Sequence, residues 1–348
     1  MGYSRYFLIS ILFLSVVLNT VANGRPLVPA LFIFGDSVVD VGNNNQLLTV
    51  VKANFPPYGR DFENHKPTGR FSNGKLAIDF IAETIGFTSS PPAYLNLYIK
   101  GNNLLSGANF ASAGSGLFYL TGGVISLNHQ LEYYKDYQKE LVNIAGPNAS
   151  SIISGALYLI SSGINDFLHN YYINPLLLKR YTPDQFSDIL IRCCSNFIQN
   201  IYALGARKIG ITTIPPMGCM PEPITIFGLH SNECVPWLNY VALNFNQKLN
   251  AISQDLKQML PGINLVILDN YQPLYDLVTK PLDYGIFEAR KGCCATGLVE
   301  TSILCNQKSI GTCANASEYV FWDGFHTTQA ANKIVADQLV PAVLSLIS

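Results

Sequence analysis

Four short polar clusters hold the residues of this sequence that could do chemistry. Gly-Asp-Ser ends at Ser37, Ala-Gly-Ser-Gly occupies 113–116, Gly-Ile-Asn-Asp occupies 163–166, and Trp-Asp-Gly-Phe-His ends at His326. A serine hydroxyl becomes a nucleophile when a base removes its proton, and a third group must hold that base in the correct tautomer. His326 could be the base and Asp323 the third group, because residues three apart in a turn can bring an imidazole and a carboxylate together. The pattern therefore indicates acyl transfer through Ser37.

The same clusters offer hydrogen-bond donors for the oxyanion of a tetrahedral intermediate, which this chemistry requires. The backbone amide of Ser37, the amide of Gly114 or Gly116, and the side-chain amide of Asn165 could supply them. Each cluster alone also has an ordinary structural interpretation, as a strand-ending turn, an Asx turn or a helix cap. Their conjunction favours a catalytic site, and the other four histidines lack an acid at the same close spacing in a comparable cluster.

Strand-like apolar runs alternate with helix-like runs, and this alternation predicts the elements that must position the four clusters. The predicted strands are 29–34, 104–112, 156–163, 206–214 and 263–269. The predicted helices are 74–86, 126–146, 182–205, 236–260 and 327–347. Five near-continuous apolar strands joined by helices predict a parallel sheet covered on both faces, which is a three-layer α/β/α fold.

The first three polar clusters directly follow the first three predicted strands, and the fourth lies just before the last predicted helix. Because open parallel sheets bind ligands at the carboxyl ends of their strands, this placement supports one shared site. No linker rich in Pro, Gly or Ser divides residues 25–348, so we interpret them as a single domain. Within it, residues 271–313 look like a long loop held by cysteines.

The first 24 residues are typical of a secretory signal peptide. Arg5 precedes an apolar block, and small residues allow cleavage after Gly24, or after Ala22 as the near alternative. A signal anchor is disfavoured because the apolar block is shorter than the ~20 residues that a membrane span needs. No later segment has about 18 uninterrupted apolar residues, so no membrane-spanning segment is expected after signal removal.

The charge balance argues against nucleic acid as a partner. The chain has 22 Lys and Arg against 23 Asp and Glu, and its longest basic clusters are pairs. A polyanion binder needs a basic excess or stripe. No nucleic-acid partner is therefore expected, and the sequence leaves the oligomeric state open.

All eight cysteines follow the predicted signal peptide, and an even count in an exported protein favours disulfides, which we expect within local clusters. Their spacing lacks the Cys-x-x-Cys pairs of zinc sites, so no metal is expected. Asn148 and Asn315 each begin an Asn-Ala-Ser triplet, which makes them candidate glycosylation sites in a secreted protein.

Two further patterns bear on other functions. The segment GRFSNGK at 69–75 has the spacing of a phosphate-binding loop, but Leu76 replaces the Ser or Thr that would hold magnesium, and no strand precedes it. The nucleophile-elbow pattern Gly-x-Ser-x-Gly does not occur in the sequence, which argues against an ordinary α/β-hydrolase.

Six blocks in order resemble the plant-type GDSL esterase/lipase family of SGNH hydrolases: FGDSVVDVGNNN, GRFSNGK, GANFASAGSG, SSGINDF, GARKIGITTIPPMGCMP and YVFWDGFH. The resemblance spans nearly all of the mature chain. It implies a flavodoxin-like three-layer fold and cofactor-independent hydrolysis of carboxylic esters by Ser37, Asp323 and His326. It also matches Asn165 to the asparagine of the third block and, through the pattern FASxxxG, favours Gly116 as the oxyanion-hole glycine.

The sequence departs from the family pattern at Val38, where the name motif has Leu, and at Thr327, where the last block commonly has Pro. Neither side chain transfers a proton, so activity is still expected. We therefore expect a secreted serine esterase that acts through an acyl-enzyme on a small or lipid-like ester. The alternatives are an acyltransferase that passes the same acyl group to an alcohol, and a catalytically silent binding protein.

Overall fold

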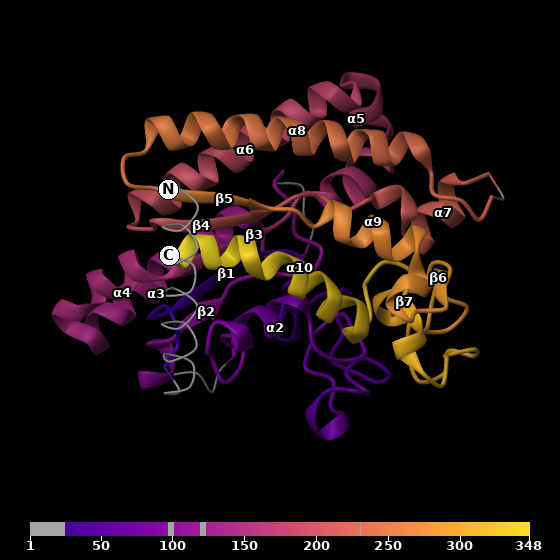
Figure 1. The fold of residues 1–348 in the computed structure, drawn as a ribbon, viewed down its shortest axis with the longest axis horizontal. Coiled ribbons are helices and arrows are strands. Elements are labelled where there is room, and N and C mark those ends of the chain that lie inside the picture. Colours follow the sequence, from indigo (N-terminus) through magenta and orange to yellow (C-terminus); the bar gives the residue numbers. More distant parts are fainter. Residues whose placement is uncertain (1–24, 97–100, 119–122, 230) are drawn as a thin grey trace, which may run out of the picture.

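A five-stranded parallel sheet forms the centre of the protein, with the strand order β2-β1-β3-β4-β5 (Figure 1). The computed structural model describes residues 25–96, 101–118, 123–229 and 231–348, so the predicted signal peptide lies outside the described residues. The strands are β1 (Leu31–Gly35), β2 (Gly107–Asn109), β3 (Leu157–Ser161), β4 (Lys208–Thr212) and β5 (Asn264–Leu268). The prediction of five parallel strands is confirmed, although β2 is much shorter than the predicted run 104–112.

The strand order places a topological switch point between β1 and β3. The chain passes from β1 to β2 on one side and then returns to place β3 on the other side of β1. This is the flavodoxin-like order, in which the crevice at the carboxyl ends of the two central strands is the usual binding site. The loops that carry Ser37 and Asn165 leave β1 and β3 at this crevice.

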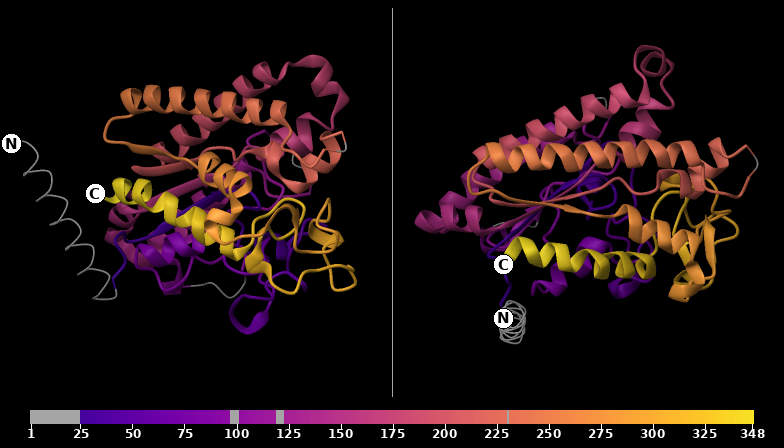
Figure 2. Two further views of the ribbon diagram at one scale, coloured as in Figure 1. Left: turned by 45° about the vertical axis from the view of Figure 1, so that its right-hand side comes forward. Right: turned by 45° about the horizontal axis from the view of Figure 1, so that its top comes forward.

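Helices cover both faces of the sheet, which confirms the three-layer fold (Figures 1 and 2). One layer contains α3 (Leu127–Ala145), α6 (Pro183–Ala203) and α8 (Pro236–Met259). The other contains α2 (Ala77–Thr84), α9 (Tyr271–Thr279) and α10 (Gln329–Ile347). The shorter helices α4 (Ala149–Gly155), α5 (Pro175–Arg180) and α7 (Pro221–Phe227) lie in connections where the sequence analysis placed none.

Aromatic side chains join β1 to the first of these layers. Phe32 and Phe34 of β1 lie with their ring centroids 5.2 and 5.6 Å from that of Tyr134 in α3, and Phe34 lies 5.3 Å from Phe197 in α6. All four rings are almost fully buried. Large aromatic rings bury much apolar area, so they fix β1, and with it the start of the Ser37 loop, against two long helices.

Helix α10 is, within the described residues, the helix whose length and apolar composition would also suit a membrane span. In this fold it packs on β4 and β5 and against α2 and α9, and buries Ala331, Val335, Leu339 and Val343. The Thr328 side chain accepts a hydrogen bond from the Ala331 amide and so caps its first turn. We therefore interpret α10 as a core helix.

Residues 271–313 are not one long loop, contrary to expectation. They contain α9 and β6 (Glu288–Gly292), and β6 pairs in parallel with β7 (Tyr319–Phe321) in a small second sheet. Pro273 within the first turn of α9 obscured the helix in the sequence. Proline is tolerated there because the first amides of a helix have no intrahelical acceptor.

Three disulfides join cysteines that are near neighbours in the sequence: Cys219–Cys234, Cys293–Cys313 and Cys294–Cys305. Local pairing is confirmed for these six residues. Cys193 and Cys194 are free thiols in α6. Consecutive helical residues point about 100° apart, so this pair faces different directions, and Cys194 is buried among core side chains.

A small second group of buried residues lies beneath the last two disulfides, separate from the main core. We call it the satellite core; its members are Ala53, Tyr58, Phe71, Ala113, Cys293, Cys294, Ala295, Cys305, Ala316 and Trp322. It brings the 53–71 segment against the cysteine-rich segment, next to the loop that carries Asp323 and His326.

Candidate active site

The turn after β1 holds Ser37 at the carboxyl edge of the sheet. Gly35 has φ +141°, and a Cβ atom there would meet the carbonyl oxygen of Ser161 in β3 at 1.9 Å, so only glycine fits. Gln130 of α3 donates to the Gly35 carbonyl and accepts from the Gly35 amide, both at 2.8 Å. The Asp36 amide donates to Ser161 at 3.1 Å. Helix α3 and strand β3 therefore fix the position of the backbone that leads into Ser37.

Ser37, His326 and Asp323 lie in one hydrogen-bonded line. The Ser37 Oγ is 2.8 Å from His326 Nε2, and His326 Nδ1 is 2.9 Å from Asp323 Oδ2. The backbone amides of Phe325 and His326 also donate to Asp323 Oδ1, at 2.9 and 2.7 Å. The three-residue spacing thus forms a tight turn around the carboxylate, after β7 and before α10. In this geometry the imidazole can take the serine proton while the carboxylate holds Nδ1–H.

Two aromatic rings pack against the imidazole of His326. The ring centroids of Phe71 and Phe325 lie 4.7 and 5.2 Å from that of His326. His326 is only 8% exposed, so little water reaches its ring. The contact with Phe71 links the histidine to the satellite core.

Asn165 follows β3 and faces the same cleft as Ser37. Its Nδ2 donates to the Ser115 carbonyl at 2.8 Å, and its Oδ1 is 3.0 Å from His169 Nδ1. One hydrogen of the Nδ2 amide is thus engaged by Ser115. The amide group is therefore oriented from both ends, and Asn165 lines a cleft of about 280 Å³ together with Ser37 and His326.

The two candidate glycines of the second cluster lie in different surroundings. Gly114 lines the cleft beside Ser37, in a left-handed conformation with φ +82°. A Cβ atom on Gly116 would instead meet the Asp166 carboxylate at 2.6 Å, and that carboxylate accepts the amides of the two residues after Gly116. Within the described residues, the amides of Ser37, Gly114 and Gly116 donate no hydrogen bond, so a free amide does not separate the two glycines. Gly114 is the one that lines the cleft together with Ser37, whereas the family pattern favoured Gly116.

The other polar residues of segment 38–44 form hydrogen bonds that hold the loops around the cleft together. Asp40 accepts the amides of Gly42 and Asn43 at 2.7 and 2.8 Å and that of Ala113 at 3.0 Å. Asn43 and Asn44 donate to carbonyls of the 109–113 segment at 2.7 to 2.9 Å. These bonds tie the Ser37 loop to the glycine cluster, so the acid and the asparagines keep two parts of the site in register.

Three buried carboxyl groups surround this region. Burial raises the pKa of Asp36 to about 7, that of Asp166 to about 7 and that of Asp40 to about 6, and backbone amide donors offset part of each increase. The Asp36 carboxyl accepts the Val38 amide at 3.1 Å and so shapes the turn that carries Ser37. These groups titrate near neutral pH without lying in the line from Ser37 to Asp323.

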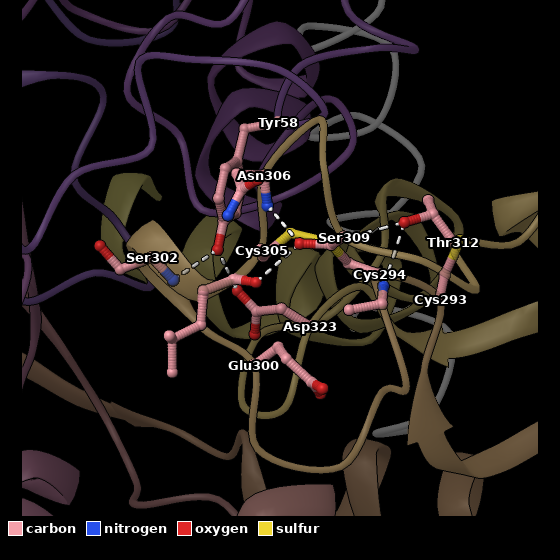
Figure 3. The surroundings of a disulfide bond; sticks show 12 residues. Tyr58, Cys293, Cys294, Glu300, Ser302, Cys305, Asn306, Ser309, Thr312 and Asp323 are labelled. Atoms are coloured by element: carbon pink, nitrogen blue, oxygen red, sulfur yellow. Dashed lines mark hydrogen bonds between the residues drawn. A yellow bond between two sulfur atoms is a disulfide. The ribbon is translucent and has the colours of Figure 1, made fainter.

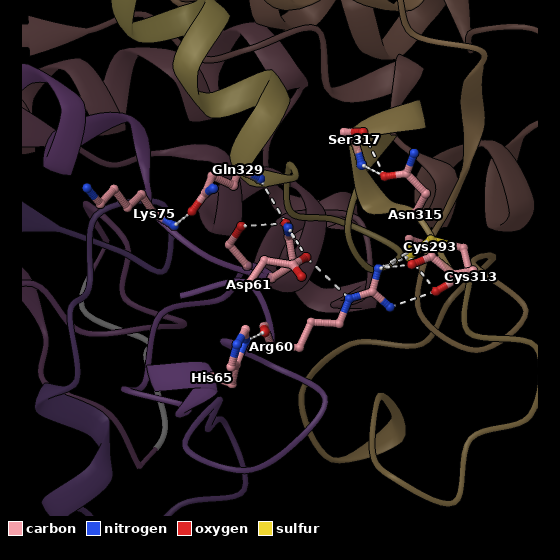
Figure 4. Close-up of polar contacts among 12 residues, drawn as sticks. Arg60, Asp61, His65, Lys75, Cys293, Cys313, Asn315, Ser317 and Gln329 are labelled. Atoms are coloured by element: carbon pink, nitrogen blue, oxygen red, sulfur yellow. Dashed lines mark hydrogen bonds and ion pairs between the residues drawn. A yellow bond between two sulfur atoms is a disulfide. The ribbon is translucent and has the colours of Figure 1, made fainter. Parts of the chain in front are cut away.

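The segment 69–75, whose spacing resembles a phosphate-binding loop, holds the start of α10. Ser72 Oγ donates to the Thr327 carbonyl at 3.0 Å, and Asn73 Oδ1 accepts the Gln329 amide at 2.8 Å. The Lys75 amide donates to Gln329 Oε1 at 2.7 Å (Figure 4). The polar groups of this segment thus fix the chain directly after His326, which explains the motif without a nucleotide.

Arg60 ties the same region to the disulfide-bonded segment. Its Nη1 donates to the Cys313 carbonyl at 2.6 Å (Figure 4). Its guanidinium lies 4.9 Å from the centre of the Trp322 ring. Such a stacked guanidinium adds packing as well as charge. Trp322 immediately precedes Asp323, so this contact stabilises the turn that carries Asp323 and His326.

Sequence reasoning missed Tyr58, whose hydroxyl donates to Asp323 Oδ2 at 2.7 Å. The two residues are 265 positions apart, and no local pattern links them.

Within the described residues, no group of three or more His, Cys, Asp or Glu side chains is placed to hold a metal ion. The candidate glycosylation residues Asn148 and Asn315 are both exposed.

Comparison with known proteins covers almost the entire chain. The sequence model of the GDSL-like Lipase/Acylhydrolase family matches residues 31–339, which include every residue of the site. GDSL esterase/lipase At5g22810 of Arabidopsis thaliana is 61% identical over 340 residues, covering 96% of this chain and 94% of that protein. GDSL esterase/lipase At5g03820 of the same plant is 56% identical over 337 residues, covering 94% of each. GDSL esterase/lipase APG, also from Arabidopsis thaliana, is 55% identical over 326 residues, covering 92% of each.

Proposed function

Because this chain belongs to the GDSL-like lipase/acylhydrolase family and is a carboxylic ester hydrolase, we propose that it is a secreted serine esterase that works through an acyl-enzyme on Ser37. The observation that carries the proposal is the unbroken line from Ser37 Oγ through His326, at 2.8 and 2.9 Å, to Asp323. A serine with only a structural role would not need an imidazole at hydrogen-bond distance whose other nitrogen is held by a buried carboxylate.

In the acylation step, Ser37 Oγ attacks the ester carbonyl carbon while its proton passes to His326 Nε2. Asp323 holds Nδ1–H and stabilises the imidazolium that forms. The histidine then returns the proton to the alcohol oxygen, the ester bond breaks, and the acyl group remains on Ser37. Water enters next, and its oxygen attacks the acyl carbon while His326 Nε2 takes one of its protons. His326 then gives that proton to Ser37 Oγ as the bond between Oγ and the acyl carbon breaks, and the acyl group leaves as a carboxylic acid.

The tetrahedral intermediate of each step places a negative charge on the former carbonyl oxygen. The free amides of Ser37 and Gly114 and the oriented Nδ2 of Asn165 border the cleft where this oxygen would lie. Preorganised donors stabilise such a charge without reorganising during the reaction. We therefore assign these three groups to the oxyanion hole, with Gly114 in place of Gly116.

The lining of the cleft supports a small or lipid-like ester as the substrate. Apolar side chains of Val51, Phe71, Val124 and Phe325 border the cleft beside the polar groups of the site. These apolar side chains can bind the hydrocarbon parts of a ligand, while the polar side chains on the rest of the wall fix its reacting group. An alcohol in place of water would turn the same acyl-enzyme toward acyl transfer.

Secretion is supported by features at several places in the chain. Disulfides persist in oxidising compartments, and three are present. The glycosylation candidates Asn148 and Asn315 are both exposed, and the first 24 residues are typical of a signal peptide. A secreted form beginning at residue 25 or 23, whose mass falls on glycosidase treatment, is the expected product. A full-length protein retained in the cell would contradict this part of the proposal.

The central experiment tests Ser37 directly. A fluorophosphonate probe should label Ser37 in the native protein, and Ser37→Ala should abolish both labelling and ester hydrolysis. Ser187→Ala is the control, because Ser187 is buried in α6 and donates to the Pro183 carbonyl at 2.8 Å, away from the cleft. Labelling of another serine, or hydrolysis retained by Ser37→Ala, would refute the assignment. A panel of esters assayed with and without alcohol acceptors separates hydrolysis from acyl transfer.

A further inference from the structure

Tyr58 is a fully buried residue at the centre of the satellite core. Its ring packs edge-on against Phe55, Phe71 and Trp322, with centroid distances of 5.9, 5.6 and 6.3 Å. Apolar packing alone would be served equally well by phenylalanine. The hydroxyl is therefore the part of the residue that calls for explanation, because a buried hydroxyl is costly unless it is hydrogen-bonded.

The direction of the hydrogen bonds of Tyr58 follows from its two partners (Figure 3). The Ser302 backbone amide lies 2.8 Å from the phenol oxygen and can only donate to it. The phenol proton is then directed to Asp323 Oδ2, at 2.7 Å. Both carboxylate oxygens lie close to His326 Nδ1, Oδ2 at 2.9 Å and Oδ1 at 3.0 Å. Tyr58 and His326 therefore share one acceptor atom.

We infer that Tyr58 is a positioning residue for the catalytic carboxylate: its hydroxyl fixes the rotation of Asp323 so that Oδ2 stays in line with His326 Nδ1. The inference rests on the proposed serine mechanism. Asp323 Oδ1 is held by the two backbone amides of its own turn, and Tyr58 supplies the side-chain donor that holds Oδ2 apart from the histidine itself. Without the Tyr58 hydroxyl, only His326 would bind Asp323 Oδ2, and His326 is the group that the carboxylate must orient.

The surroundings keep the phenol permanently a donor. Burial raises the pKa of Tyr58 well above its ordinary value, and the nearby Asp323 charge adds to this increase, so the hydroxyl retains its proton. Ser302 is fixed in turn, because its Oγ accepts the Lys52 amide at 2.9 Å and donates to the Val50 carbonyl at 2.6 Å. The Cys294–Cys305 disulfide closes the loop that contains Ser302. The position of the phenol is therefore set by a cross-linked loop and not by the reacting groups.

The test compares Tyr58→Phe with Tyr134→Phe. Tyr134 is also fully buried, and its hydroxyl contacts Tyr158 and Gln138 at 2.6 and 2.9 Å in the α3 layer, away from the cleft. Loss of a hydrogen bond to a charged group predicts that Tyr58→Phe lowers kcat by about 10- to 100-fold, with KM changed less than about twofold. Fluorophosphonate labelling of Ser37 should slow by the same factor. Tyr134→Phe should keep wild-type turnover.

Turnover and labelling by Tyr58→Phe at the rate of the Tyr134→Phe control would overturn the inference. That outcome differs from failure of the serine mechanism, which would leave Ser37 unlabelled in the wild-type protein. Site-specific 3-fluorotyrosine at position 58 covers the case in which Tyr58→Phe does not fold, because it keeps the ring and hydroxyl and strengthens only the donor. The low-field NMR signal of the His326 Nδ1 proton should then move upfield, because its acceptor is shared more strongly. An unchanged signal would also overturn the inference.

Discussion

Asn165 gives the sharpest test of the site, because a catalytic role and a structural role predict opposite orders of effect. Its side chain is 3% exposed and lies at the N-cap position of the short helical segment Asp166–Tyr171, yet it makes no capping hydrogen bond there. Its Nδ2 instead contacts the Ser115 carbonyl at 2.8 Å and its Oδ1 contacts His169. The structure thus supports a side chain held for its amide donor.

Replacement of Asn165 by alanine removes one donor that acts mainly in the transition state. Loss of such a donor costs roughly 10²- to 10³-fold in kcat, about 3 to 4 kcal/mol, with little change in KM. The same variant also breaks the hydrogen bond to Ser115, which should cost about 1 kcal/mol of the free energy of unfolding. The loss in turnover should therefore exceed any loss expected from destabilisation.

Asn165→Asp should be at least as harmful to turnover as Asn165→Ala. It keeps the size of the side chain but places a carboxylate oxygen where Nδ2 now lies, 2.8 Å from the Ser115 carbonyl oxygen. Two acceptors would then face each other, and a negative charge would stand where the oxyanion forms. If Asn165 served as a cap, aspartate would largely rescue the protein, because both residues are good N-caps.

The assay measures kcat and KM on a soluble ester together with the melting temperature of each variant. Asn174→Ala is the matched control, since Asn174 does cap a helix: its side chain accepts the Leu176 amide at 3.0 Å at the start of α5. This control should lose roughly 1 kcal/mol of stability and keep its turnover. An active Asn165→Asp enzyme beside a merely destabilised Asn165→Ala would refute the oxyanion role.

His326→Ala should abolish turnover about as fully as Ser37→Ala, and the double variant should be no slower, because a triad acts as a unit; additive losses would contradict a shared mechanism. Alkylation of the denatured, unreduced protein should modify two thiols, Cys193 and Cys194, and all eight after reduction; intact mass gives both numbers, and a different first number would show other pairing. Burial raises the pKa of Asp36 from 3.8 to about 7, so the folded state holds a proton that the unfolded state releases. Its contribution to the free energy of unfolding should therefore fall as the pH rises from about 4 to about 7, and denaturant titrations should show a flatter pH dependence for Asp36→Asn; an unchanged slope would place the proton elsewhere.

The sheet could be predicted from the sequence because its strands are buried on both faces and therefore read as apolar runs. The prediction was weakest where tertiary contacts override this signal. In β2, position 107 is a glycine and not a β-branched residue typical of strands, because a Cβ atom there would meet the Leu31 carbonyl oxygen at 2.0 Å. For residues 271–279, Pro273 and the cysteines further along the chain led to the prediction of a loop. The structure instead shows a helix, α9, shortly after the end of β5.

The meeting of Ser37, Asp323 and His326 could be predicted because each belongs to a compact local motif at a predicted element boundary. The residues alone left Gly114 and Gly116 as alternative oxyanion donors. The direction of a backbone amide in a turn depends on backbone angles, and the presence of a glycine does not specify those angles. Tyr58 carried no signal, since its role depends on a partner 265 residues away. Local motifs thus predict the groups that meet at the cleft, while contacts over long sequence distances determine which groups hold them in place.

Ser37 and His326, the proposed nucleophile and base, are 289 residues apart in the chain. During synthesis, a nascent chain therefore carries Ser37 almost from the start but has no base until residue 326 has emerged. Contacts between such distant residues also form slowly, because the intervening chain must be ordered first. Ester hydrolysis followed during cell-free translation should thus begin only when nearly the whole molecule has folded. The onset of ester hydrolysis can therefore report when synthesis and folding of the chain are complete.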